Sequence, residues 1–459
     1  MTHMNRKQRQ RKWKFVYGPG MHKRILAVLG LLAVLSAAGC SRLRNGSANE
    51  MTDAGVMKNA DETVFPSSNP SLELASTEMG AGNLMPNKDT PAAVAPETEP
   101  VTPETEPVVP EMDAVSERVE ALLADMTLEE KIYQMFIITP EQLTGVSRVT
   151  AAGNATKASL KQYPVGGLVY FSGNLESIDQ TKAMLSNVQR FANEIENVDL
   201  FLCVDEEGGR VARVATNEAF QLENVAPMAS VSSEEEAYRC GDTIGAYLSE
   251  LGFNVDFAPD ADVLTNGANT VIGDRSFGSD PDIVTKYAIA CSDGLHAHGM
   301  MSTFKHFPGH GATEGDTHDG YAYTDKSYEE LAEAELRPFY AAKEHGVDMV
   351  MAAHISVPAV TGDDTPSSLS EQMITGILKR ELGYNGLIVT DALNMGAVAA
   401  HYDSAEVSVK AVTAGVDLLL MPADFHAAYD GIYNAVQNGE ISEERIDESV
   451  RKILTAKLK

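Results

Sequence analysis

The sequence predicts a single (β/α)8 barrel that follows a signal peptide and a disordered stalk, and three observations lead to this prediction. Short apolar runs recur eight times after residue 115, amphipathic helical patterns lie between them, and a leader of different composition precedes them. Apolar strands that alternate with helices are typical of a parallel sheet covered on both faces. Eight such units favour a barrel, and a doubly wound open sheet is the alternative that the pattern leaves open.

The leader, residues 1–39, has the pattern of a secretory signal peptide. Its first part is basic, the apolar run Ile25–Leu35 follows, and Ser36-Ala-Ala-Gly-Cys40 ends it. The run is shorter than the ~20 residues that span a membrane. Ala37-Ala-Gly-Cys40 resembles a bacterial lipobox, so we expect Cys40 to carry lipid and to hold the protein outside the cytoplasm on the cell membrane. An uncleaved signal anchor is the alternative, and translation from Met21 would leave a leader of ordinary length.

Residues 40–112 form the predicted stalk. Pro, Thr, Glu, Ser and Asn dominate it, and Pro91–Pro107 contains a short imperfect repeat. A segment with few aromatic side chains and many acids buries too little apolar surface to offset the entropy of ordering. We therefore expect a flexible connection between membrane and domain.

Charge and cysteine content exclude several classes of function. The formal net charge of the 459 residues is -30, whereas nucleic-acid binding needs a basic face. The four cysteines contain no C-x-x-C spacing, so no redox motif or structural zinc site is indicated. We expect a monomer without a metal or another cofactor.

The predicted catalytic domain covers residues 113–459. Helical spacing runs over 115–126, Thr127-Leu-Glu-Glu130 is a capping box that opens the next helix, and a last helix covers 443–454. The eight predicted strands lie in the apolar runs 133–138, 165–171, 199–205, 253–259, 300–306, 347–353, 386–391 and 416–421.

Polar side chains lie at the ends of five of these strands. The active site of a barrel lies at the carboxyl ends of its strands. Carboxylates and cations that converge there indicate a polyhydroxylated substrate and acid/base chemistry. The residues are Asp205, Asp260, Asp262, Lys305, His306, His354 and Asp391.

The segment after the fifth strand, residues 305–320, contains three histidines. Pro308-Gly309 interrupts the spacing of His306 and His310, so the two cannot form the helical pair of a zinc protease. Asp316-Thr-His318 is better interpreted as a carboxylate that orients an imidazole. We expect the glycines of this segment, Gly309, Gly311, Gly315 and Gly320, to let it move over a substrate, and a solvated polar loop is the alternative.

Four motifs now carry a resemblance to a known family. Lys305-His-Phe-Pro-Gly-His-Gly311 with Asp316-Thr-His318, Val204–Arg213, Val271–Gly278 and Val389–Met395 occur in the family's order. Together they resemble glycoside hydrolase family 3 in its β-N-acetylglucosaminidase (NagZ-like) branch, over essentially all of residues 115–459. Glu206 departs from the pattern, because Gln is common at that position.

The resemblance implies a role for each residue. Asp391 corresponds to a nucleophile that forms a covalent glycosyl intermediate with retention, His318 to the general acid/base and Asp316 to its partner. The implied substrate is β-linked N-acetylglucosamine at the end of a muropeptide or related glycan. The residues implied in binding its hydroxyl and acetamido groups are Asp205, Arg213, Arg275, Lys305 and His306.

Two other functions stay open on the sequence. A histidine acid/base does not repel phosphate, so a phosphorylase of the same fold is possible. A non-catalytic lipoprotein that binds wall glycan is the third hypothesis, and it predicts the loss of a catalytic position. Asp391, His318 and Asp316 are all present.

Overall fold

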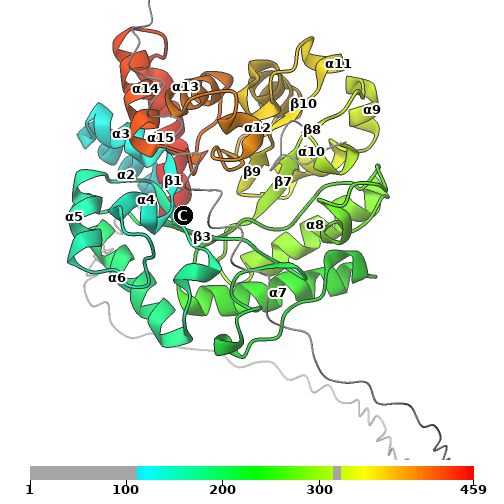
Figure 1. Ribbon diagram of the computed structural model, residues 1–459, viewed down its shortest axis with the longest axis horizontal. Coiled ribbons are helices and arrows are strands. Elements are labelled where there is room, and N and C mark those ends of the chain that lie inside the picture. The colour runs from blue at the N-terminus through cyan, green and yellow to red at the C-terminus, as the bar shows by residue number, and fades with distance from the viewer. Residues whose placement is uncertain (1–110, 314–321) are drawn as a thin grey trace, which may run out of the picture. The chain divides into compact units, whose positions relative to one another are not determined.

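The structure is a computed structural model that describes residues 111–313 and 322–459. Within them, parallel strands alternate with helices in a mixed α/β fold (Figure 1). All eight predicted strands are confirmed. They are β1 (Phe136–Ile138), β2 (Gly167–Val169), β3 (Phe201–Val204), β6 (Val255–Asp256), β7 (Thr303–Phe307), β9 (Met349–Ala352), β11 (Leu387–Thr390) and β12 (Leu419–Leu420).

The strands pair in parallel in two groups. One sheet has the order β12-β1-β2-β3-β6, and the other has the order β11-β9-β7. Isolated parallel bridges connect the groups, Val255 to Met301 between β6 and β7 and Val389 to Leu418 between β11 and β12. Because the pairing is parallel throughout, the carboxyl ends of all eight strands lie at the same end.

Helices separate the strands along the chain and lie outside them (Figure 1). The predicted capping box is present, with Thr127 accepting from the Glu130 amide at the start of α3. The helices are α2 (Glu111–Asp125), α3 (Leu128–Gln134), α4 (Pro140–Thr144), α5 (Asn154–Gln162), α6 (Ile178–Glu196), α7 (Glu234–Leu251), α8 (Pro281–His296), α9 (Tyr328–Glu333), α10 (Arg337–Glu344), α11 (Pro358–Thr361), α12 (Gly396–Ala399), α13 (Ser404–Ala414), α14 (Phe425–Gln437), α15 (Glu443–Leu458) and the π-helix η7 (Gln372–Glu381).

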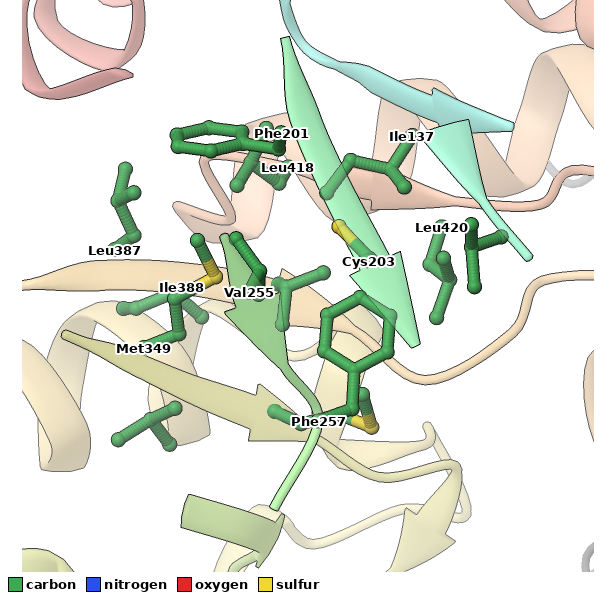
Figure 2. Packing of buried hydrophobic residues seen from close by; sticks show 14 of the residues in the cluster. Ile137, Phe201, Cys203, Val255, Phe257, Met349, Leu387, Ile388, Leu418 and Leu420 are labelled. Atoms are coloured by element: carbon green, nitrogen blue, oxygen red, sulfur yellow. The ribbon is translucent and has the colours of Figure 1, made fainter. Parts of the chain in front are cut away.

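Apolar side chains from the strands form the core. Figure 2 shows Phe201, Val255 and Ile388 among the side chains that different strands contribute to the core, and all three are fully buried. Cys203 is buried among them as a free thiol, as its apolar surroundings predict. The strands are too short to form this core alone, so the helices that cover them provide the rest of the buried surface.

Four two- or three-residue strands were not predicted. β4 (Glu206–Gly208) and β5 (Val211–Ala212) form an antiparallel hairpin directly after β3, and β8 (Ala322–Tyr323) pairs in parallel with β10 (Ile355–Ser356). The hairpin matters for the site because it begins next to Asp205 and ends next to Arg213.

No helix in residues 111–313 and 322–459 is long and apolar enough to cross a membrane.

Candidate active site

A cavity of about 490 Å³ opens at the carboxyl ends of the strands. This volume is within the range of small-molecule sites. Six of the residues predicted from the sequence line it, namely Asp205, Arg213, Arg275, Lys305, His306 and Asp391. Segments separated by almost two hundred residues therefore meet where parallel strands bring their ends together. Asp316, His318 and Cys40 lie outside the described residues.

Asp391 follows β11 directly and faces the cavity. Its backbone amide donates to Ala352 O at 2.8 Å, which continues the pairing of β11 with β9, and its Oδ1 accepts the Ala392 amide at 2.7 Å. Burial alone would raise the pKa of Asp391. The nearby His306 and His354 rings and the Ala392 amide outweigh burial, and the pKa is lowered. Asp391 is therefore an ionised carboxylate at neutral pH.

Glu207 is the centre of a buried ion-pair network beside Asp391. Arg275 binds it through two hydrogen bonds, Nε to Oε2 at 2.7 Å and Nη2 to Oε1 at 2.8 Å. Lys305 Nζ lies 2.6 Å from Oε1 of the same carboxylate. Burial alone would raise the pKa of Glu207, but the two cations lower it strongly. Such a paired, two-pronged arrangement fixes the geometry of all three side chains.

Lys305 also connects this network to Asp205. Its ammonium lies 2.9 Å from Asp205 Oδ1, and Arg213 Nη2 lies 3.8 Å from Asp205 Oδ2. The Lys305 side chain is only 2% exposed, whereas that of Asp205 is 21% exposed. Asp205 and Arg213 can therefore reach a ligand in the cavity, while Lys305 and Arg275 mainly hold carboxylates in place.

Glu206 has a structural role that the sequence did not indicate. Its carboxylate is completely buried and accepts backbone amides from Arg213 at 2.5 Å, Val214 at 2.8 Å and Ala215 at 2.8 Å. The Tyr247 hydroxyl donates to the same carboxylate at 2.9 Å. These four bonds close the β4–β5 hairpin and fix the backbone from which Arg213 extends. Gln, common here in the family, has only one acceptor oxygen on its side chain.

His306 is held between a carboxylate and a cation. Its Nδ1 lies 2.6 Å from Asp262 Oδ2, and its Nε2 lies 3.3 Å from Arg275 Nη2. Because Arg275 can only donate, Nε2 accepts and Nδ1 carries the proton. Burial and then Arg275 lower the pKa of His306 to about 4. The ring is therefore neutral at physiological pH.

Asp260, Asp262 and His306 are close enough to be considered as a metal site. Their possible ligand atoms lie within 4.8 Å of one another. However, the Arg275 guanidinium lies 3.4 Å from Asp260 Oδ2, and Asp262 is already bonded to His306 and to the His310 amide at 2.5 Å. Asp262 and His306 are thus bonded to each other, and Arg275 is the cation beside Asp260, whose Oδ2 accepts no hydrogen bond from a described residue.

Two glycines after β7 are required for packing. A Cβ at Gly309 would lie 2.5 Å from Glu335 Cβ, and Gly309 has a φ of +136°. A Cβ at Gly311 would lie 2.2 Å from the Val263 carbonyl oxygen. These positions allow close approach of neighbouring segments, and the predicted movement of the segment over a substrate stays a prediction. Gly315 and Gly320 lie outside the described residues.

Sequence reasoning missed Glu207 and Arg210. Glu207 follows Asp205 in the same polar run, and this adjacency was the available signal. Arg210 connects the hairpin to the next loop, with Nε donating to Asp274 Oδ1 at 2.8 Å and Nη2 to the Val271 carbonyl at 2.6 Å. His354, predicted at the site, lies behind it, fully buried and bonded to Ser368 Oγ at 2.7 Å.

Comparison with known proteins identifies the family. The glycosyl hydrolase family 3 N-terminal domain matches residues 127–456. The chain belongs to glycosyl hydrolase family 3. This confirms the resemblance carried by the four motifs, and with it the enzyme class of glycoside hydrolase.

Individual relatives of this family 3 protein are named as β-hexosaminidases. A β-hexosaminidase of Hydrogenovibrio crunogenus is 34% identical over 293 residues, which cover 61% of this chain and 79% of that protein. β-Hexosaminidase A of Pseudoalteromonas piscicida is 32% identical over 324 residues, covering 65% of this chain. The match spans 54% of that longer relative.

A solved structure is similar in both fold and sequence. It is a family 3 β-N-acetylglucosaminidase from Paenibacillus sp. str. FPU-7, with a TM-score of 0.68 and 36% identity. The match covers 72% of this chain and 62% of that chain.

Proposed function

We propose that this protein is a retaining exo-β-N-acetylglucosaminidase that removes terminal β-linked N-acetylglucosamine from peptidoglycan-derived muropeptides or related glycans. One observation carries the proposal. An ionised Asp391 faces a cavity whose other charged groups are held in place by ion pairs. The sugar is suggested by relatives named β-hexosaminidase and by the Paenibacillus structure named β-N-acetylglucosaminidase.

The proposed reaction has two steps. Asp391 attacks the anomeric carbon of the sugar, and a covalent glycosyl–Asp391 ester forms as the glycosidic C–O bond breaks. His318, oriented by Asp316, donates a proton to the leaving oxygen. In the second step His318 takes a proton from water, and the water oxygen replaces Asp391 at the anomeric carbon, so that configuration is retained.

A histidine acid/base is compatible with the electrostatics of the cavity. A second carboxylate beside Asp391 would raise the pKa of the nucleophile, whereas a neutral imidazole does not. The unperturbed imidazole pKa of about 6.5 also lies near neutral pH.

We further propose that the exposed charged groups bind the sugar. Asp205 accepts hydrogen bonds from hydroxyl groups, and Arg213 donates to them. Lys305 was also predicted to bind the sugar, but its side chain is only 2% exposed, so we assign it mainly to holding Asp205 and Glu207 in place. Arg275 and His306 are the remaining predicted binding residues. In the structure both are largely engaged with Glu207, Asp260 and Asp262, so we assign them mainly to holding the binding surface in shape.

The eight parallel strands support a closed (β/α)8 barrel as the complete architecture. The two sheets and the bridges at Val255 and Val389 form a continuous series that returns from β12 to β1. A barrel of this kind forms its active site from the segments that follow the strands, which is where the cavity lies.

Hydrolysis of a chromogenic N-acetylglucosaminide by the full-length chain tests the activity. The expected result is release of the chromophore at a rate independent of phosphate, with the β-anomer seen first by NMR. A rate that depends on phosphate, with formation of a sugar 1-phosphate, would instead establish a phosphorylase. A glucoside serves as the matched substrate, and equal rates on both would contradict the proposed sugar specificity.

The role of His318 needs a separate experiment. His318→Ala is expected to lose little activity on substrates with acidic leaving groups, because these need little protonation, and much more on poor leaving groups. Equal losses on both kinds of substrate would show that His318 only binds.

We also propose that lipid on Cys40 anchors the enzyme outside the cytoplasmic membrane. Cys40→Ala is expected to abolish incorporation of radiolabelled fatty acid and to shift the protein from the membrane fraction. Unchanged labelling of this variant would refute the anchor.

A further inference from the structure

A second cavity, of about 690 Å³, lies at the other end of the strands. Residues that directly precede strands line it, including Asn254 before β6, Met301 before β7, Asp348 before β9 and Gly386 before β11. Because the strands are parallel, this cavity is at the end opposite to Asp391. Nothing in the proposed reaction uses it.

The charge of this amino-end cavity contrasts with that of the protein. Five of its lining residues are lysine or arginine and two are aspartate, while the whole chain has a formal net charge of -30. A concentration of positive charge within an anionic protein attracts anions to that place. The cationic residues are Lys343, Arg451, Lys452, Lys457 and Lys459.

Two of these cations are already neutralised. Arg451 binds Glu120 through Nε at 2.5 Å and Nη2 at 3.1 Å. Lys452 Nζ lies 3.3 Å from the buried Asp417. Both side chains connect α15 to the rest of the fold, so they have a structural explanation.

Lys343 and Lys457 are different. Across residues 111–313 and 322–459, neither ammonium forms a salt bridge with a carboxylate. Lys457 Nζ donates to Gln134 Oε1 at 2.8 Å and lies 4.9 Å from the centre of the Phe201 ring. Burial lowers the pKa of Lys457 to about 7, against the opposing effect of Asp199. An anion beside this group would offset part of its desolvation.

One part of the remaining wall of the cavity is apolar. Met300, Met301 and Leu387 lie on it together with the buried Tyr384 ring. The volume is in the range of sites for organic ligands and exceeds what a free inorganic ion needs. A ligand that fits therefore combines an anionic group with an organic part.

We propose that the amino-end cavity binds a phosphate-bearing organic molecule, with the phosphate at the cationic part of the lining, to which Lys343 and Lys457 belong, and the organic part against the methionine wall. Lysine binds phosphate as a point charge without requiring a planar partner. The shared chemistry fits two sources, a soluble phosphomonoester and the headgroup of a phospholipid.

Titration calorimetry of the full-length protein with glycerol 3-phosphate at pH 6 tests this proposal. The parent protein is expected to bind saturably, and Lys343→Gln and Lys457→Met are each expected to bind about tenfold more weakly, as loss of one charge near a phosphate implies. Lys343 is exposed, so its variant is expected to fold normally even if Lys457→Met does not. Lys410→Gln is the control, because Lys410 lies on α13 outside this cavity, where its ammonium is 3.9 Å from Glu406 Oε1 and 5.6 Å from the centre of the Tyr402 ring.

A second arm separates the two sources. Vesicles of phosphatidylglycerol and phosphatidylcholine are compared for the parent and for the Lys343→Gln, Lys457→Met double variant, so that any binding through the leader is common to both. A loss confined to phosphatidylglycerol vesicles identifies a lipid headgroup, and a loss confined to glycerol 3-phosphate identifies a soluble ligand.

Three outcomes would overturn the proposal. The first is that the parent protein binds neither glycerol 3-phosphate nor phosphatidylglycerol vesicles, and the second is that the parent and the double variant bind equally well. The third is that N-acetylglucosamine competes with glycerol 3-phosphate, which would place the phosphate in the active site. Hydrolysis of the chromogenic substrate by Lys343→Gln is expected to be unchanged.

Discussion

The two ends of the parallel strands differ in whether their cationic side chains are paired with carboxylates. At the carboxyl end, Lys305 and Arg275 are each bound to Glu207, and buried carboxylates outnumber the cations around them. At the amino end, Lys343 and Lys457 have no carboxylate partner within the described parts of the chain. The buried cations Lys305 and Arg275 are thus paired at one end, while the other end leaves positive charge for something outside the fold.

This difference bears on how the site works. A catalytic carboxylate is effective when its surroundings are fixed before the substrate arrives. The ion pairs around Glu207 provide that rigidity, and the Asp391 carboxylate is not part of this network. Among the described residues, the carboxylate accepts a hydrogen bond from the Ala392 amide. Removal of charged groups at the carboxyl end should therefore reduce hydrolysis of the substrate, whereas removal of charged groups at the amino end should leave hydrolysis unchanged.

The largest effect is expected for Asp391→Asn. An amide cannot form the covalent ester, so turnover should fall by at least about a thousandfold, or ~4 kcal/mol of transition-state stabilisation. Initial rates on the chromogenic N-acetylglucosaminide measure the loss. Thermal unfolding of the variant should stay close to the parent, and substantial residual turnover by a folded variant would contradict the nucleophile assignment.

Glu207→Gln should be the most destabilising change at the carboxyl end. Removal of this carboxylate leaves Lys305 and Arg275 buried with insufficient negative charge, and breaking a buried pair in this way costs about 3–5 kcal/mol. Urea unfolding measures the free energy. The matched control is Glu250→Gln, whose exposed pair with Lys182 at 2.6 Å should contribute far less to stability. Equal losses in the two variants would show that the network is not a rigid frame.

Glu206→Gln is expected to act on binding more than on turnover. The amide offers one acceptor oxygen where the carboxylate satisfies four donors, so the backbone that carries Arg213 loses part of its support. Each carboxylate oxygen accepts two of these bonds, so the substitution leaves two buried donors without an acceptor, at a cost of about 1–3 kcal/mol each. We expect KM to rise about tenfold with a smaller change in kcat. Tyr247→Phe removes a single donor and should leave KM unchanged. A fall in kcat at constant KM would contradict the positioning role.

Local patterns predicted the elements that local forces determine. Apolar runs located all eight strands, and Thr127 with Glu130 located the start of α3. Local patterns could not predict the partners of Glu206 and Glu207, because Arg275 lies 68 residues from Glu207 in the sequence and Tyr247 lies 41 residues from Glu206. The packing at Gly309 and Gly311 could not be predicted for the same reason, since the atoms that a Cβ there would meet belong to Glu335 and Val263.

The smallest expected effect is a difference between the two ends in how their contribution to stability depends on pH. His296 lies in the amino-end cavity, and its hydrogen bond to Asp348, Nε2 to Oδ2 at 2.7 Å, raises its pKa above the usual 6.5. Since the folded protein holds this proton more tightly than the unfolded chain, the pair stabilises fully below pH 6.5, and the contribution disappears as pH rises through the raised pKa. Glu207 behaves in the opposite way, because its lowered pKa gives stability above about pH 4.5 that is lost as pH falls.

Urea unfolding of the parent and of His296→Gln at pH 5.5 and pH 8.5 measures this contribution. Asp293, the other acid that raises this pKa, and the cavity lysines are common to both proteins, so the difference between them isolates His296. The difference in unfolding free energy should be larger at pH 5.5, by about 1 kcal/mol or less for a pair that is 30% exposed on each side. A difference that stays constant with pH would show that His296 contributes through packing alone, and the amino end would then differ from the carboxyl end in charge but not in how it responds to protons.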